Sequence, residues 1–127
     1  MRVFLVRHAE SAPGEPDELR SLTAAGRDAA RALGERLAEQ QPTAVVSSPL
    51  LRARETADLI ARACRLDASA DDNLAPGATA DTLREAARDR GEAVVAVGHQ
   101  PDCSEIVLEL TGRELSFPPA GVAELDL

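Results

Sequence analysis

The chain has 127 residues, 44% of them hydrophobic, and a formal net charge of −8 at pH 7. This length and composition predict one globular domain over residues 1–127 that buries well over half of the surface of the unfolded chain. The excess of acidic residues opposes binding to nucleic acid or to an anionic membrane, and the absence of lysine excludes a phosphate-binding Walker loop and a Schiff-base enzyme.

No apolar stretch approaches the roughly 20 residues that span a bilayer. The first apolar run begins almost at Met1, where cleavage of a signal peptide would remove the functional residues discussed below. We therefore expect a cytoplasmic protein. Cys64 and Cys103 lie far apart in the sequence without metal-ligand spacing, which predicts two reduced thiols.

Predicted strands and helices alternate along the chain, which favours a three-layer α/β/α fold with a mostly parallel sheet. The first strand is the apolar run at residues 3–6. After a polar stretch, Thr23 is expected to cap a helix that runs to about Gln40. A short strand at 43–46 follows, and Ser48-Pro49 has the cap and first-turn chemistry that opens a second helix.

The second half of the chain continues this alternation, and its helices have recognisable start and stop signals. Its predicted elements are an edge strand at 66–70, a helix at 82–90 capped by Asp81, a strand at 93–97, a helix through Leu110 capped by Asp102 or Ser104, and a final strand at 121–127.

The only two histidines stand just past the two most apolar predicted strands. His8 follows the first strand and Arg7, and His99 follows the strand at 93–97. Because reactive groups gather where the strands of an open α/β sheet end, the two imidazoles are expected to meet at one sheet edge. Arg52, in the first turn of its helix, lies where free backbone N–H groups favour an anion. A neutral imidazole beside guanidinium groups is a nucleophile next to a site for phosphoryl oxygens.

Each of these residues also has a plainer interpretation. A single histidine at a strand end, such as His8, is more often structural than catalytic. Arg7 can pair with a surface carboxylate such as Glu10, and Arg52 can be one of several solvated charges on its helix. Glu10 can orient a neighbour or simply be solvated, and Ser11 can donate to phosphate or serve a turn. The ordered set of residues favours the chemical interpretation.

Three segments resemble, in order, the motifs of the histidine phosphatase superfamily, the phosphoglycerate-mutase-like enzymes. Residues 5–10, LVRHAE, resemble the Arg-His-Gly motif, with Ala9 in place of its glycine. Residues 47–57, SSPLLRARETA, resemble the second motif, which supplies another phosphate-binding arginine, and residues 97–101, VGHQP, resemble the third. The segment LTAAG at 22–26 is similar to the family's first helix entry. The short length and the sequence His99-Gln100-Pro101 most resemble the small SixA-type phosphohistidine phosphatases.

The resemblance implies a phosphoglycerate-mutase-like fold with a minimal cap and a phosphatase that forms a covalent phosphohistidine on His8. Arg7, Arg52 and His99 would neutralise the phosphoryl oxygens, and Ser11 would add a donor. His99 would act charged and His8 uncharged, which predicts an activity optimum at mildly acidic to neutral pH. Because these cations take the role of a metal, we expect neither a metal nor another cofactor.

One departure from the family pattern bears on the substrate. Many members protonate an alkoxide leaving group with a carboxylic acid from the loop after the second motif, but here Asn73 stands at that position and Asp72 is the available substitute. The imidazole leaving group of a phosphohistidine substrate needs less help from an acid than an alkoxide does. The short connections between the predicted elements leave the site open, which suits a phosphoryl group presented on a protein surface. We therefore expect a phosphohistidine-carrying protein as substrate. A phosphatase for a small metabolite or sugar phosphate is the alternative, and a non-catalytic phospho-binding module is a third.

Overall fold

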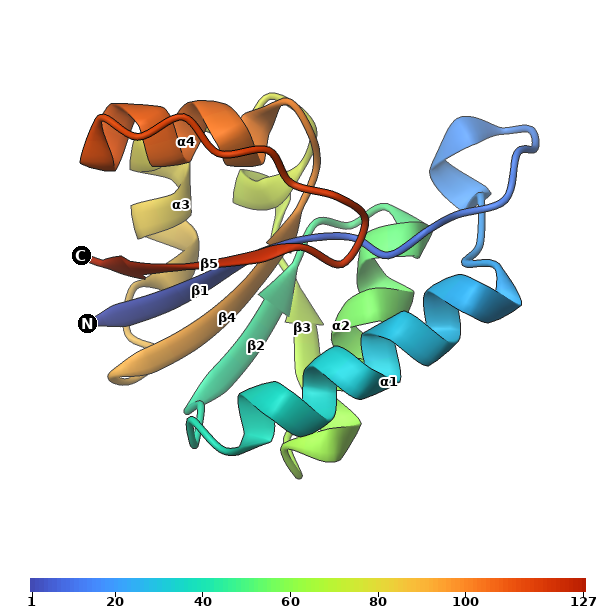
Figure 1. The fold of residues 1–127 in the computed structure, drawn as a ribbon, viewed down its shortest axis with the longest axis horizontal. Helices are drawn as coiled ribbons and strands as arrows, with labels where there is room; N and C mark the ends of the chain where they lie inside the picture. The colour runs from blue at the N-terminus through green and yellow to red at the C-terminus, as the bar shows by residue number, and fades with distance from the viewer.

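A five-stranded sheet forms the middle layer of the computed structural model, which describes residues 1–127 (Figure 1). The strands, in sheet order, are β3 (Ala68–Ala70), β2 (Ala44–Ser47), β4 (Ala93–Gly98), β1 (Arg2–Arg7) and β5 (Val122–Asp126). The first four are parallel, and β5 pairs antiparallel with β1 at one edge. The prediction of a mostly parallel sheet is confirmed, although β3 is two residues shorter than expected.

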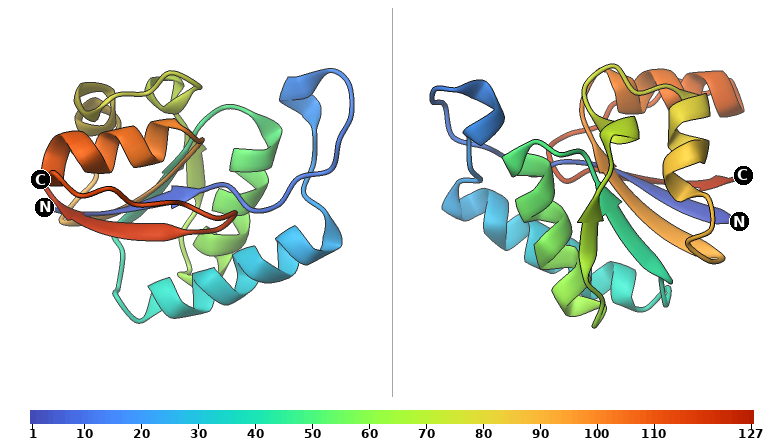
Figure 2. Two further views of the ribbon diagram at one scale, coloured as in Figure 1. Left: turned by 45° about the horizontal axis from the view of Figure 1, so that its top comes forward. Right: turned by 180° about the vertical axis from the view of Figure 1, so that it is seen from behind.

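Two pairs of helices cover the sheet, one on each face (Figures 1 and 2). One face carries α1 (Ala24–Ala38) and α2 (Leu51–Ala63), and the other carries α3 (Ala80–Ala87) and α4 (Asp102–Thr111). The fold is therefore the expected three-layer α/β/α arrangement. No helix has both the length and the apolar character needed to cross a membrane.

Strand β1 shows how the sequence builds two cores. Val3 and Leu5 pack into the core beneath α3 and α4, whereas Phe4 and Val6 pack into the core above α1 and α2. Because side chains alternate between the faces of a strand, an unbroken apolar run is what a strand covered on both sides requires. This double burial fixes the register of β1 and therefore the position of the residues that follow it.

The helix boundaries correct several expectations. Helix α1 begins as predicted, because the Thr23 hydroxyl accepts a hydrogen bond from the Gly26 N–H at 2.9 Å, but it ends at Ala38 rather than near Gln40. Helix α3 begins two residues before the predicted start at 82. Thr79 and Thr82 form a reciprocal capping box there, which places Asp81 inside the helix rather than at its cap.

Two predicted cap residues have other partners. Ser48 does not cap α2, which begins at Leu51; its hydroxyl oxygen accepts the Leu50 N–H at 3.2 Å. Asp102 is the first residue of α4, and its carboxylate accepts the N–H groups of Gly77 and Ala78, at 2.8 and 3.2 Å. Neither side chain therefore caps the helix for which it was predicted, and that of Asp102 joins separate segments of the chain.

The entry into α1 packs directly on the chain that follows His8. The Thr23 N–H donates to the Glu10 carbonyl oxygen at 3.0 Å, and a Cβ atom added at Gly26 would collide with the same oxygen. Only glycine at position 26 permits this close approach. The LTAAG segment thus packs directly against the backbone of the loop after β1.

Both cysteines are free, as predicted. Cys103 is buried in the core beneath α4, and burial raises the pKa of its thiol to about 12. Burial also raises the pKa of the half-buried Cys64 thiol. Neither side chain lines the pocket described next, so the cysteines are packing residues.

Candidate active site

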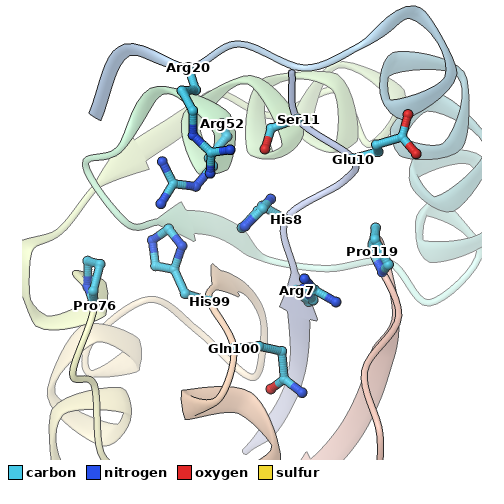
Figure 3. Close-up of a pocket in the computed structure, with 10 residues that line it drawn as sticks. All are labelled: Arg7, His8, Glu10, Ser11, Arg20, Arg52, Pro76, His99, Gln100 and Pro119. Carbon is cyan, nitrogen blue, oxygen red and sulfur yellow. The ribbon is translucent and has the colours of Figure 1, made fainter. Parts of the chain in front are cut away.

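The carboxyl ends of three neighbouring strands bring the two histidines together. Strands β1 and β4 are adjacent, with Arg7 opposite Gly98, and the His8 N–H donates to the Gly98 carbonyl oxygen at 3.0 Å. Because the pairing continues one residue past the strand, His8 and His99 project from the same edge, with ring centroids 5.3 Å apart. The prediction that the imidazoles meet at one sheet edge is confirmed (Figure 3).

The ring of His8 is held in one orientation by its neighbour's backbone. Its Nδ1 lies 2.8 Å from the Ala9 carbonyl oxygen, which accepts only from a protonated nitrogen, so Nδ1 carries the hydrogen and Nε2 keeps its lone pair. Burial lowers the pKa of His8, and the charges of Arg52 and Arg7 lower it further, while the bond to Ala9 opposes these effects. The ring is therefore neutral at pH 7, with Nε2 free to act as a nucleophile.

His99 is fixed by a residue that sequence analysis assigned to a helix cap. Its Nε2 lies 2.7 Å from the hydroxyl oxygen of Ser48, which is fully buried. Ser48 follows β2, the strand on the other side of β4, and its N–H continues the ladder to the Val97 carbonyl. The contact leaves Nδ1 as the ring nitrogen of His99 without a protein partner. No local sequence signal marks Ser48, because its partner lies 51 residues away.

The charge of His99 differs from the expected one. Burial, followed by the proximity of His8 and Arg52, lowers its pKa to about 4, although Asp17 acts in the opposite direction. His99 is therefore neutral at pH 7 in the ligand-free protein, whereas the predicted reaction uses it in its charged form. Only an added negative charge beside it, such as a phosphoryl group, would favour its protonation at neutral pH.

Three arginines supply hydrogen-bond donors around these rings. Arg7 donates from Nη1 to the Phe117 carbonyl oxygen at 2.9 Å, and Arg52 donates from Nη1 to the Asp17 carbonyl oxygen at 2.9 Å. The Nε atoms of Arg7, Arg20 and Arg52 are the only buried side-chain nitrogens or oxygens in the protein without a hydrogen-bond partner. The Nε of Arg20 lies 3.0 Å from the Asp17 carboxylate, but those of Arg7 and Arg52 have no partner at all. Unsatisfied buried donors are rare and unfavourable, so two beside one pocket indicate a ligand rich in acceptor oxygens.

One face of α2 builds several of these contacts at once. Arg52 reaches the pocket, while three and four residues later Glu55 accepts the Leu22 N–H at 2.8 Å and Thr56 accepts the Ala9 N–H at 3.0 Å. Residues at this spacing share one face of a helix. The second motif therefore contributes more than its arginine, because it also fixes the backbone beside His8 and before α1. Sequence analysis missed the roles of Glu55 and Thr56.

The pocket itself has a volume of about 410 Å³ and, apart from two prolines, a wholly polar or charged lining (Figure 3). Its lining residues are Arg7, His8, Glu10, Ser11, Arg20, Arg52, Pro76, His99, Gln100 and Pro119. Five of the six residues predicted for the site are among them. Gln100 was noted only as part of the third motif, and Arg20 was not singled out, since a lone arginine between Leu19 and Ser21 gives no local signal.

Asp72, the predicted substitute for a general acid, lies elsewhere. It begins the short 3-10 helix η2 (Asp72–Leu74), is exposed, and is absent from the pocket lining. The only acidic residue in the lining is Glu10, whose Oε1 accepts a hydrogen bond from the Thr23 hydroxyl at 2.8 Å. No group of three or more His, Cys, Asp or Glu side chains is arranged to hold a metal ion.

Comparison with known proteins identifies the family of this chain. A model of the histidine phosphatase superfamily (branch 1) matches residues 3–77, which include most of β1, His8 and Arg52. The chain belongs to the histidine phosphatase superfamily. Residues after 77, including His99 at the end of the central strand β4, complete the lining of the pocket.

Solved structures show the same fold over the whole chain. The structure of the protein histidine phosphatase SixA in complex with tungstate superposes with a TM-score of 0.87 and 27% identity, covering 100% of this chain and 88% of that one. A crystal structure of a SixA protein from Agrobacterium tumefaciens has a TM-score of 0.82 and 31% identity over 98% of this chain and 90% of its own. Together with the family, these neighbours place the chain among the phosphatases.

The curated relatives that match in sequence are named as phosphoglycerate mutases rather than as phosphohistidine phosphatases. The "Probable phosphoglycerate mutase GpmB" of Salmonella paratyphi C is 37% identical over 81 residues, which is 58% of this chain and 37% of GpmB. The corresponding protein of Citrobacter koseri is 40% identical over the same length. The chain thus spans little more than a third of the length of these relatives.

Proposed function

We propose that this histidine phosphatase removes phosphate from phosphohistidine on a protein, through a covalent phosphohistidine formed on His8. The observation that carries the proposal is that three arginines, two of them with a buried Nε that has no protein partner, line a pocket in which His8 presents a free Nε2. The donors match a phosphoryl group, which has several acceptor oxygens and a negative charge. The nucleophile lies among them.

In the first step, the lone pair of His8 Nε2 attacks the phosphorus atom, a new N–P bond forms, and the N–P bond of the substrate breaks. The bond from Nδ1 to the Ala9 carbonyl stabilises the positive charge that develops on the His8 ring. Arg7 and Arg52 bind the phosphoryl oxygens and so orient the phosphorus atom for in-line attack. When the other nitrogen of the substrate imidazole already carries a proton, this imidazole leaves as a neutral group.

In the second step, water attacks the phosphorus atom of phospho-His8, the N–P bond breaks, and inorganic phosphate leaves. His8 then returns to its neutral form with the hydrogen on Nδ1. The negative charge of the bound phosphoryl group raises the pKa of His99, so that a proton on this ring adds a further donor. His99 therefore becomes charged together with the ligand rather than before it.

The leaving group favours phosphohistidine over a phosphoester. An alkoxide must be protonated as it leaves, but Asp72 lies outside the pocket and Glu10 is its only acidic lining residue. An imidazole needs no such acid. The similarity to SixA structures over nearly the whole chain supports the same choice.

A small metabolite phosphate is the second candidate, because the curated sequence relatives are of the phosphoglycerate mutase type. A side-by-side assay separates the two candidates. We expect kcat/KM to be highest for a phosphohistidine-bearing protein, lower for an artificial aryl phosphate and lowest for sugar phosphates, with His8→Ala as the control for contaminating activity. A large preference for a sugar phosphate would replace the proposal, and binding without turnover would indicate a phospho-binding module.

A further inference from the structure

The segment between β1 and α1 carries an acidic residue into contact with the pocket arginines. Its short 3-10 helix η1 (Asp17–Leu19) has no buried residue and stands away from the sheet beside the amino-terminal end of α2 (Figure 1). The Asp17 carbonyl accepts the hydrogen bond from Arg52 described above. The helix η1 is thus bonded to α2 through Arg52, a residue that lines the pocket.

The carboxylate of Asp17 bridges two of the three pocket guanidinium groups. Its Oδ2 accepts from Arg52 Nη2 at 3.3 Å, and its Oδ1 lies 3.0 Å from Arg20 Nε without an aligned hydrogen bond. The Asp17 side chain is 63% exposed, whereas that of Arg52 is 9% exposed. An exposed acid on a buried cation is a contact that solvent or another anion can displace.

The negative charge of Asp17 also opposes the lowering of the His99 pKa. A carboxylate at this position has the charge and the acceptor oxygens of a phosphoryl group, and it uses guanidinium groups that the proposed reaction needs. Two anions cannot accept from the same N–H group with good geometry. Binding of phosphate and the Asp17 contact therefore exclude each other, at least in part.

We propose that Asp17 competes with the phosphoryl group for Arg52 and Arg20, and so weakens the binding of inorganic phosphate, the product of the reaction. This inference rests on the proposed function, because it requires the phosphoryl group to bind at these arginines. A protein substrate offsets the competition through contacts beyond the pocket, but free phosphate has none. Asp17 is therefore a positioning residue that favours product release, because its carboxylate returns to the guanidinium groups as phosphate leaves.

The neighbouring Glu18 provides a matched control. It lies in the same exposed 3-10 helix and forms no side-chain ion pair or hydrogen bond with an arginine. Asp17→Asn and Glu18→Gln therefore change the net charge equally, one residue apart, but only the first removes the contact with Arg52 and Arg20. Both substitutions are at exposed positions, where the fold is expected to tolerate them.

The experiment measures the affinity for inorganic phosphate by calorimetry at fixed ionic strength and pH 7. We expect Asp17→Asn to bind phosphate roughly two- to fivefold more tightly than the unmodified protein, in line with the loss of exposed ion pairs. Glu18→Gln should bind nearly as the unmodified protein does, and Asp17→Glu should restore weak binding. In steady-state assays, the Ki of phosphate as a product inhibitor should fall in Asp17→Asn alone.

The outcomes separate this inference from the proposed function. If Asp17→Asn binds phosphate no more tightly than Glu18→Gln, or more weakly than the unmodified protein, the competition is refuted while the phosphate site stands. If the unmodified protein binds no phosphate, the proposed site and the inference both fail.

Discussion

Acidification from pH 8 to pH 5 is expected to destabilise the folded protein through His99. Burial and its positive neighbours hold the pKa of this ring at about 4, compared with 6.5 in an unfolded chain. Above pH 6.5 the ring is neutral in both states and does not affect stability. Between pH 6.5 and about 4 the unfolded chain binds a proton that the folded protein does not, so stability falls as the pH falls.

The size of the effect follows from these two pKa values. At pH 5 the unfolded ring lies about one and a half pH units below its pKa, and each unit corresponds to about 1.4 kcal/mol. The folded protein should therefore lose about 2 kcal/mol through His99, which is a large part of the stability of a small domain. His8, whose pKa is also lowered by burial, adds a loss of the same sign.

Urea unfolding at pH 8 and pH 5 tests this value. His99→Gln keeps an amide that can bond the Ser48 hydroxyl but cannot titrate, and the carboxylates that titrate in this range are common to both proteins. We expect the free energy of unfolding to fall by about 2 kcal/mol less in the variant than in the unmodified protein. Equal losses in the two proteins would refute the lowered pKa and the electrostatic description of the pocket.

Three further predictions concern the anion site, the support beneath it and the absence of a metal. Arg52→Lys should lower kcat on the order of 10²-fold or more, because lysine lacks the planar fork, whereas the exposed Arg54→Lys should be nearly silent; equal effects would place the anion site elsewhere. Gly26→Ala should lower the free energy of unfolding by roughly 1–3 kcal/mol through its collision with the Glu10 carbonyl, while Gly14→Ala, whose Cβ would only make ordinary van der Waals contact with Arg20 at 3.9 Å, should be close to neutral in the same urea titration. Prolonged chelation with EDTA should leave activity unchanged, and loss of activity that a divalent ion restores would indicate a metallophosphatase.

The sheet edge that carries the histidines could be predicted because its determinants are local. Continuous apolar runs end at Arg7 and Gly98, and a strand buried on both faces leaves little freedom in where it stops. Thr23 likewise caps α1 by a hydrogen bond to the third residue along the chain. Such short-range signals can be read from the sequence alone.

Much of the remaining site depends on contacts between distant segments. Ser48 bonds His99 across 51 residues, and Glu55 bonds the Leu22 N–H across 33, so neither role has a local pattern. The charge of His99 depends on its burial, which the sequence does not display. Asp72 was assigned from its place after the second motif, but the turn at η2 leaves it exposed and outside the pocket.

Covalent catalysis by His8 can be tested by identifying the atom that becomes phosphorylated. The protein is mixed with a phosphohistidine substrate, quenched rapidly in alkali to preserve N–P bonds, and examined by mass spectrometry and phosphorus NMR. Because Nδ1 of His8 is bonded to the Ala9 carbonyl, the account predicts phosphate on His8 Nε2 and no adduct in His8→Ala with its fold intact. Phosphate on Nδ1, on a serine or on a cysteine, or turnover without an adduct, would contradict it.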